Sequence, residues 1–375
     1  MSPSPSSAAV RFAVVGNPGN RRVTMFTDAV LAAGLPAPRI VAWRDALRGT
    51  YGFAPGELVR VDSPGEDPEV DRALRGGGDP TRVEGSALWY RRFTDAVLEV
   101  ARAAADAGAT LLGDPRDIAV LFDKRRCHAR LLAAGVPVPP ALTAPVRGWD
   151  DLKERLRAAR MPRAFIKPAH GSSASGVIAL EFGRPGRLRA TTSVETTADG
   201  RLFNSLRVRR YEVEREVAAL VDALAGDGLH VERWLPKAAQ AGRAADLRVV
   251  VVDGRATHAV VRTSRSPMTN LHLGGARGDL AAARAATEAA GLGWDAVTGI
   301  AEQAAACFPR TLCVGVDVLP GTGWRRVAVG EVNAFGDLLP RLTGLPGSGA
   351  EEQDTYAAQV AAVLRRERHR AAAAA

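Results

Sequence analysis

The chain has 375 residues, 46% of them hydrophobic and 24% charged, a composition that is ordinary for a globular protein. This length exceeds what one hydrophobic core usually serves, so we expect two or three domains. No apolar run approaches the roughly 20 residues that a membrane span needs, and residues 1–9 lack the basic start and apolar centre of a signal peptide. We therefore expect a cytoplasmic protein with no membrane partner.

The net charge of +9 comes almost entirely from arginine, because lysine occurs only at positions 124, 153, 167 and 237. In such a chain a lysine is informative, since its compact ammonium suits a phosphate better than a bidentate partner. The excess charge fits an anionic substrate, ATP itself, or simple solubility. No stripe of base-stacking aromatic residues accompanies the arginines, so we expect no nucleic-acid partner. The three cysteines lack Cys-x-x-Cys spacing, which argues against a disulfide framework and a structural zinc site.

The N-terminal third predicts an α/β domain over residues 10–113, after a disordered tail over 1–9 that is rich in Ser, Pro and Ala. A glycine-containing turn at 16–20 is followed by Arg21 and Arg22 at a helix start, where anions are favoured. This turn is either a plain tight turn or a substrate-facing loop. The predicted elements, in order, are strand Phe12–Val15, helix Val23–Ala33, strand Val59–Asp62, a helix capped by Asp67-Pro68, helix Ala87–Ala107 and strand Thr110–Leu112.

In the middle of the chain, Asp114-Pro115 predicts the start of one helix that carries Lys124 and ends near Gly135. The strand Phe165–Pro168 follows, and then a small-residue loop over 171–176. Residues 184–210 carry seven arginines around the turn Asp199-Gly200 and predict a hairpin. This hairpin is either a solvated surface feature or a flap that meets an acidic substrate. An amphipathic helix over Tyr211–Leu224 comes next.

The last third alternates apolar runs with turns. Two runs flanking Asp253-Gly254 predict a hairpin. The chain is expected to end in a low-complexity tail over 369–375. The elements predicted here are strands Leu247–Val252 and Ala256–Val261, helices Leu280–Ala290 and Ala296–Ala306, strands Cys313–Leu319 and Val327–Val332, and a final helix over Glu351–Arg368.

One stretch is typical of a phosphate site. Lys167 ends a strand and precedes a loop that contains Gly171, Ser172, Ser173 and Gly176. Glycine permits backbone conformations closed to other residues, serine adds hydroxyl donors, and backbone N–H groups with one ammonium can surround phosphates. The pattern is not a P-loop, which needs Gly-Lys-Ser/Thr at a helix start.

A second stretch is typical of a metal site. Glu331 and Asn333 lie two residues apart at the end of an apolar run, so on a strand both point to one face. Together with Asp317 they offer only oxygen ligands, which suit Mg²⁺. The two stretches together predict chemistry on ATP with Mg²⁺, with Mn²⁺ as the alternative metal.

These motifs, in this order, resemble the ATP-grasp superfamily, and most closely its branch of glutathione synthetases and enzymes that add glutamate to a ribosomal protein. The resemblance covers residues 114 to 340. The matching residues are Asp123-Lys124, Lys167 with its loop, Glu232-Arg233-Trp234-Leu235, Asp246-Leu247-Arg248, Arg262, the segment from Asn270 to Gly275, Asp317 and Glu331-Val332-Asn333.

The resemblance implies an ATP-grasp fold, α+β in the grasp part, with a Rossmann-like α/β pre-grasp domain over 10–113. The central subdomain would cover 114–230 with an insertion at 184–210, and the C-terminal subdomain 231–368. Site roles follow by the same resemblance. Lys124 and Lys167 contact the ATP phosphates, Glu232 to Leu235 meet adenine and ribose, Asp246 lies on the ribose or phosphate side, Arg248 and Asn270 line the pocket, Arg262 acts with Lys167 in catalysis, and Asp317, Glu331 and Asn333 bind the metal.

The implied reaction is that of an ADP-forming carboxylate–amine ligase with an acyl-phosphate intermediate. Its acid and amine would be small molecules or peptides, and we expect an acidic substrate. Homo-oligomers are common in the superfamily. The alternatives are an ATP-grasp kinase and a non-catalytic ATP-binding protein. After Asn333 the sequence continues Ala-Phe-Gly, whereas the familiar pattern has a small residue, proline and glycine, so the acceptor pocket departs from that pattern.

Overall fold

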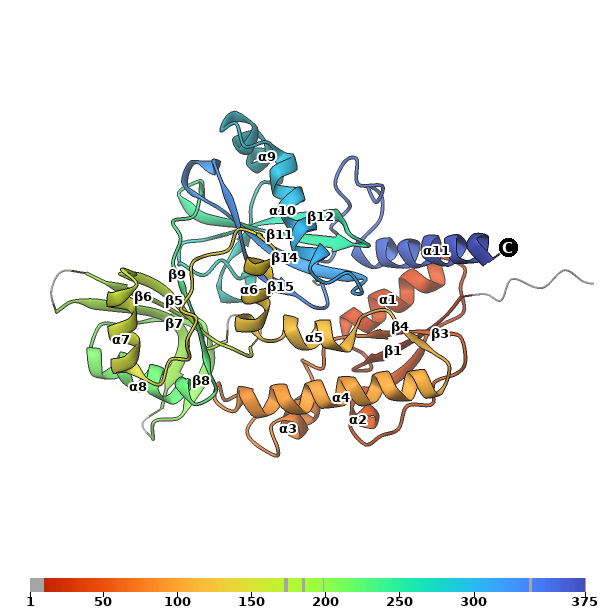
Figure 1. Ribbon diagram of the computed structural model, residues 1–375, viewed down its shortest axis with the longest axis horizontal. Coiled ribbons are helices and arrows are strands. Elements are labelled where there is room, and N and C mark those ends of the chain that lie inside the picture. Colours follow the sequence, from red (N-terminus) through yellow and green to blue (C-terminus); the bar gives the residue numbers. More distant parts are fainter. Residues whose placement is uncertain (1–9, 172–174, 184–185, 198, 337–338, 375) are drawn as a thin grey trace, which may run out of the picture.

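A computed structural model describes residues 10–374 except 172–174, 184–185, 198 and 337–338 (Figure 1). It contains three sheets. The N-terminal sheet is parallel, in the order β2-β1-β3-β4. Its strands are β1 (Arg11–Gly16), β2 (Arg39–Ala42), β3 (Glu57–Val61) and β4 (Thr110–Leu111).

Both faces of this parallel sheet are covered, which explains why β1 is a continuous apolar run rather than an alternating one. Phe12 and Val14 pack into one core cluster, with α1 (Arg21–Ala32), while Ala13 and Val15 pack into another on the opposite face. The second cluster includes residues of α2 (Trp43–Ala46), α3 (Pro68–Leu74) and α4 (Ser86–Asp106). The predicted α/β domain is confirmed, with β2 and α2 as elements that the sequence analysis did not predict.

The central sheet is antiparallel, in the order β8-β7-β6-β5-β9. One face is covered by α7 (Trp149–Ala158) and α8 (Glu214–Ala225) around a single apolar cluster. The strand β9 pairs with β5 along its full length, so the predicted boundary at 230/231 falls inside a strand of this sheet. The strands are β5 (Arg163–Pro168), β6 (Ile178–Phe182), β7 (Leu188–Thr196), β8 (Leu202–Tyr211) and β9 (Leu229–Arg233).

The arginine-rich hairpin predicted over 184–210 forms β7 and β8, and β8 is the edge strand. The loop between α3 and α4 lies along this edge, where the Val83 N–H donates to the Leu202 carbonyl at 3.0 Å. Val83 itself is buried in the central core. The strand β8 extends to Tyr211, so α8 begins at Glu214, three residues later than predicted. The hairpin is therefore docked against the N-terminal domain.

The C-terminal sheet is antiparallel, in the order β13-β12-β11-β14-β15, with β10 paired to β11. One face packs on α10 (Trp294–Ala306), with α9 (Leu280–Ala289) beside it. Its predicted hairpin about Asp253-Gly254 is confirmed, with φ of 53° and 78° at the two turn residues. The strands are β10 (Ala239–Gln240), β11 (Arg243–Val252), β12 (Arg255–Ser264), β13 (Ala276–Arg277), β14 (Cys313–Pro320) and β15 (Val327–Asn333).

The helix predicted to carry Lys124 is two helices, α5 (Pro115–Leu121) and α6 (Lys124–Ala133). The break lies at Asp123, whose extended backbone and carboxylate cap α6 by accepting from the N–H groups of Arg125 and Arg126. The prediction of one helix was wrong because an internal aspartate served as an N-cap. The break places Lys124 at the very start of α6, with apolar residues of both helices in the C-terminal core.

The final helix, α11, spans Thr355–Ala374, so it starts later than the predicted Glu351 and continues through the stretch expected to be a tail. It packs against α1 of the N-terminal domain and against β11 and β12 of the C-terminal sheet (Figure 1). No helix among the residues described is both long and apolar enough to cross a membrane.

Candidate active site

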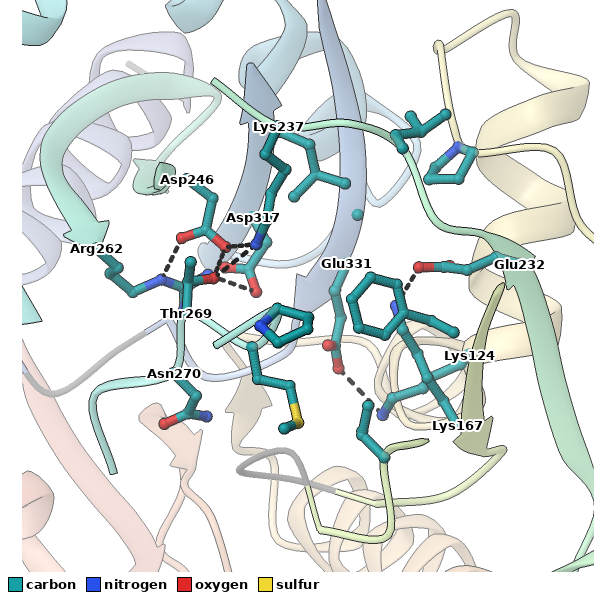
Figure 2. A pocket seen from close by; sticks show the side chains of 18 of the residues that line it. Lys124, Lys167, Glu232, Lys237, Asp246, Arg262, Thr269, Asn270, Asp317 and Glu331 are labelled. Carbon is teal, nitrogen blue, oxygen red and sulfur yellow. Dashed lines mark hydrogen bonds and ion pairs between the residues drawn. The ribbon is translucent and has the colours of Figure 1, made fainter. Parts of the chain in front are cut away.

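A cavity of about 140 Å³ lies between the central and C-terminal sheets (Figure 2). Most residues predicted for the site line it, although they come from seven helices and strands and from the segments between them. Their side chains meet because β5 and β9 form one wall and the strands β11, β12, β14 and β15 the other. The predicted residues in this lining are Lys124, Lys167, Gly171, Glu232, Arg233, Leu235, Asp246, Arg248, Arg262, Asn270, Asp317, Glu331 and Asn333.

Strand register brings the charged residues of the C-terminal sheet together. Asp317 on β14 is the cross-strand partner of Glu331 on β15 and of Arg248 on β11. The carboxylate of Asp317 accepts hydrogen bonds from Arg248. It also pairs with Arg262 at 3.1 Å. Directly opposite residues of antiparallel strands have side chains on one face, so this cluster follows from the pairing itself.

Asp246 is the centre of a second group of charges, in which Asp246 and Arg262 are buried and Lys237 is half-buried (Figure 2). It accepts from the Nε of Arg262 at 2.8 Å and from the hydroxyl of Thr269, and the Lys237 ammonium lies 3.5 Å away. Burial alone raises the pKa of Asp246, but these neighbouring cations outweigh it and hold the pKa at about 2. Burial lowers the pKa of Lys237. Asp246 therefore stays ionised and fixes the guanidinium of Arg262.

Lys167 on β5 pairs with Glu232 on β9, with 2.6 Å between Nζ and Oε1. The other carboxylate oxygen of Glu232 lies 3.0 Å from Nε2 of His230. Burial opposes both charges, yet the Lys167 ammonium holds the pKa of Glu232 at about 2, and the carboxylates raise the pKa of Lys167. Burial lowers the pKa of His230, so this imidazole is neutral and donates to the carboxylate.

Lys124 starts α6 and reaches across the cavity to two elements. Its ammonium lies 3.1 Å from Glu331 on β15 and donates to the carbonyl of Gly171 at 2.6 Å. Burial raises the pKa of Glu331, but the charges of Lys124 and Lys167 outweigh it and lower the pKa. Lys124 thus ties the predicted phosphate loop to the predicted metal-binding strand.

The cavity carries an excess of positive charge, with six cationic side chains against four carboxylates. Each carboxylate is paired with a lysine or arginine. For a polyphosphate to bind here, its oxygens must therefore replace the carboxylates as partners of these lysines and arginines. Oxygen donors freed in that exchange can bind a cation, which links the two halves of the site chemically.

The residues predicted to bind Mg²⁺ fit that ion. Asp317 and Glu331 are cross-strand partners, and Asn333 lies on the same face as Glu331. The Asn333 amide donates its Nδ2 hydrogen to the Gly315 carbonyl at 3.3 Å, so its Oδ1 remains an acceptor. Among the residues described, no three His, Cys, Asp or Glu side chains converge on one point. Two carboxylates and an amide make an incomplete oxygen shell, which suits an Mg²⁺ ion shared with phosphate.

Several predicted residues lie outside the cavity lining. Trp234 packs against Phe165, with ring centroids 5.3 Å apart, and the Arg163 guanidinium covers its face. Gly176 has a φ of 73°, and a β-carbon there would come within 2.7 Å of Val83. The glycine thus serves close packing as well as its backbone conformation. Ser172 and Ser173 are outside the described residues.

Among the site residues that sequence reasoning missed are Lys237, Thr269 and His230. Lys237 lines the cavity and donates to the Thr269 hydroxyl at 3.1 Å. The scarcity of lysine was a usable signal, because three of the four lysines line this one cavity. Thr269 and His230 act through Asp246 and Glu232, and nothing in their local sequence distinguishes them from packed polar residues.

A second cleft, of about 850 Å³, adjoins the first. Residues of the N-terminal domain form its outer wall, including Arg21 and Arg22. No arginine of 184–210 among the residues described lines either cleft, although seven occur in that segment. The two cavities share the lining residues Gly171, Ser175, Arg248, Arg262, Asn270, Glu331 and Asn333.

Comparisons with known proteins agree with this architecture. Neither a protein-family profile nor a curated protein sequence matches the chain. Solved structures do. They include the D-cycloserine synthetase DcsG, at 14% identity and TM-score 0.56 over 95% of this chain and 99% of that one. The ATP-grasp ligase PsnB with its minimal precursor aligns at 17% identity and TM-score 0.52, over 94% and 99%.

A third structure, the D-alanine–D-alanine ligase from Bacillus anthracis complexed with ATP, aligns at 12% identity and TM-score 0.50 over 96% of this chain and 97% of that one. Such low identities carry information about the fold rather than about substrates. The agreement extends over nearly the whole of each chain, including the N-terminal sheet. The chain therefore has the ATP-grasp fold.

Proposed function

We propose that the protein is an ATP- and Mg²⁺-dependent ligase that joins an acid to an amine through an acyl phosphate and releases ADP and phosphate. The observation that carries this proposal is the junction of the two cavities, where Arg248, Arg262, Glu331 and Asn333 line both. The smaller cavity suits the phosphates of the nucleotide because three of the four lysines line it. The larger cleft then holds the acid and the amine next to the γ-phosphate.

The chemistry has two steps. An oxygen of the acid's carboxylate attacks the γ-phosphorus, and the bond from that phosphorus to the β–γ bridging oxygen breaks, releasing ADP. The amine nitrogen then attacks the acyl carbon, forming the C–N bond as the carbon–oxygen bond to phosphate breaks and the nitrogen loses a proton. Neither step needs a protein nucleophile, so positioning and charge neutralisation supply the catalysis.

The residues of this chain have distinct parts in those steps. Lys124 and Lys167 bind and orient the phosphates. Arg262, whose pKa is raised by Asp246 and Asp317 against the opposing effect of burial, stays charged and stabilises the transferring phosphoryl group. Asp317, Glu331 and Asn333 would hold Mg²⁺. When bound, that ion neutralises the charge of the phosphate oxygens.

Two further sets of residues are assigned to substrate binding. Glu232 and Leu235 lie on the wall from β9 onward, and we assign the base and ribose to this wall. Asn270 caps the short 3₁₀ turn Leu271–Leu273 and lines both cavities. The acid and amine are small molecules or peptides. One structural neighbour, PsnB, has been solved with a precursor peptide, which supports including peptides among the candidate substrates.

The test is product analysis. The protein is incubated with ATP, Mg²⁺ and pooled amino acids, small acids and amines, and ADP, AMP, free phosphate and new masses are quantified. ADP with stoichiometric phosphate and an amide-mass product is the expected result. ADP with a phosphorylated product and no free phosphate would identify a kinase, and AMP formation would refute the acyl-phosphate route. The Asp317→Asn protein, expected to turn over roughly 100-fold more slowly, serves as the comparison.

A further inference from the structure

The larger cleft has room for an acid longer than one amino acid beside the amine that it also holds. At about 850 Å³ it lies near the upper end of the roughly 300–1,000 Å³ typical of ligand sites that enclose drug-sized molecules. It runs from Arg248 and Arg262 at the nucleotide junction to the start of α1 in the N-terminal domain. A ligand that fills it therefore contacts two well-separated walls.

Among the residues that the structure describes, six arginines and four carboxylates line this cleft. Two of these carboxylates already have arginine partners, since Asp67 pairs with Arg44 at 2.9 Å and Asp71 with Arg75 at 2.8 Å. A third, Glu331, pairs with Lys124 of the smaller cavity. The cleft thus presents net positive charge to its contents.

Two of the arginines lie together at the outer end of the cleft. Arg21 and Arg22 open α1, whose first turn contains no acidic residue. Arg21 is exposed, while Arg22 is half-buried and its guanidinium donates to the Phe335 carbonyl at 3.4 Å. Phe335 follows β15 by two residues, so Arg22 connects the outer wall to the strand that carries Glu331 and Asn333. The carboxylate of Glu66, on the same wall, accepts from the Asn20 amide at 2.9 Å.

We propose that the acid substrate carries a second anionic group, a carboxylate or a phosphate, which Arg21 and Arg22 bind while the reacting carboxylate lies against Arg248 and Arg262. The substrate class is then an elongated, doubly anionic acid larger than one amino acid. This inference rests on the proposed ligase function. It deepens that function by assigning the outer arginines to substrate selection.

The test measures how the affinity of the protein for a diacid depends on the length of the diacid. Linear α,ω-dicarboxylates from succinate to sebacate are titrated by calorimetry into protein saturated with Mg²⁺ and the non-hydrolysable ATP analogue AMP-PNP. Each is compared with the monoacid of equal length whose far end is an amide, and with the corresponding ω-phosphonate. Binding of AMP-PNP with Mg²⁺ is measured first by thermal shift, which tests nucleotide binding separately.

The expected result is a chain length at which the second anion improves affinity about tenfold or more, as two charge-assisted hydrogen bonds allow. That gain should disappear in Arg21→Ala/Arg22→Ala and fall partly in Arg21→Gln, which alters an exposed side chain alone. Arg48→Ala, an exposed arginine outside both clefts, should retain it. The phosphonate series decides between phosphate and carboxylate.

Three outcomes would overturn the inference. They are no gain at any length, a gain that survives in the double variant, or no measurable binding of any diacid to protein that binds the nucleotide. Each of these leaves the proposed ligase function standing. Failure of AMP-PNP to bind in the presence of Mg²⁺ would instead contradict the proposed function itself.

Discussion

Replacing Lys167 with methionine separates the structural effect of its ion pair from its proposed role toward phosphate. In the free protein the Lys167 ammonium lies 2.6 Å from Glu232, and the two side chains are 13% and 3% exposed. Removing one partner of a buried pair costs about 3–5 kcal/mol, because the other charge is left uncompensated. His230 still donates to Glu232 at 3.0 Å, so we expect the lower figure, about 3 kcal/mol.

The double variant Lys167→Met/Glu232→Leu removes both charges and replaces them with apolar side chains of similar volume. Such replacements are often neutral in stability, so guanidinium denaturation should recover most of the lost free energy. Binding of AMP-PNP with Mg²⁺ should remain impaired in both variants. The single variant's loss of unfolding free energy should shrink as the pH falls, because without the Lys167 ammonium the Glu232 carboxyl has a higher pKa and takes up a proton more readily. A single variant as stable as the parent, or a double variant that binds the nucleotide normally, would refute the reasoning.

Three further results are expected. Because Glu331 is held by Lys124, Mg²⁺ without nucleotide and nucleotide without Mg²⁺ should each bind at least about tenfold more weakly than the pair together, and equal affinities in calorimetry would contradict this coupling. Asp317→Asn should lower turnover roughly 100-fold while circular dichroism stays unchanged, and unaltered turnover would remove Asp317 from the site. The free energy of unfolding should decline as the pH falls below 6.5, because His230 is buried in its neutral form and takes up a proton when the protein unfolds. It should decline further from pH 4.5 towards pH 2, because the pKa of Glu232 is lower in the folded protein than in the unfolded chain. A free energy of unfolding that stays constant over both ranges would contradict the burial of these two groups.

Local patterns in the sequence were sufficient for most elements and for the chemical types at the site. The strands β1, β14 and β15 were predicted because apolar runs bounded by turns specify them locally, and the turn Asp253-Gly254 specified its hairpin in the same way. Lys167 was predicted because lysine is scarce here, and Glu331 and Asn333 because side chains two apart on a strand share a face.

What required the tertiary structure was everything that depends on pairing between distant segments. The break at Asp123 depends on its carboxylate capping α6, and the same residue is also compatible with a continuous helix. The assignment of β9 to the central sheet, rather than to the C-terminal part, comes from its register with β5. Hydrophobic periodicity defines a face of a strand but not the strand that it pairs with.

The sequence by itself determined which groups are available for phosphate and metal chemistry, because those groups are side chains of fixed type. The tertiary structure decided which of them meet. Lys237 and Thr269 join Asp246, and His230 joins Glu232, through contacts between strands and loops that no local pattern encodes. It also brought Arg21 and Arg22 to the cleft that adjoins the cavity of Lys167, across more than a hundred residues of chain. The reason is physical, because long-range packing selects among the many pairings that local propensity permits.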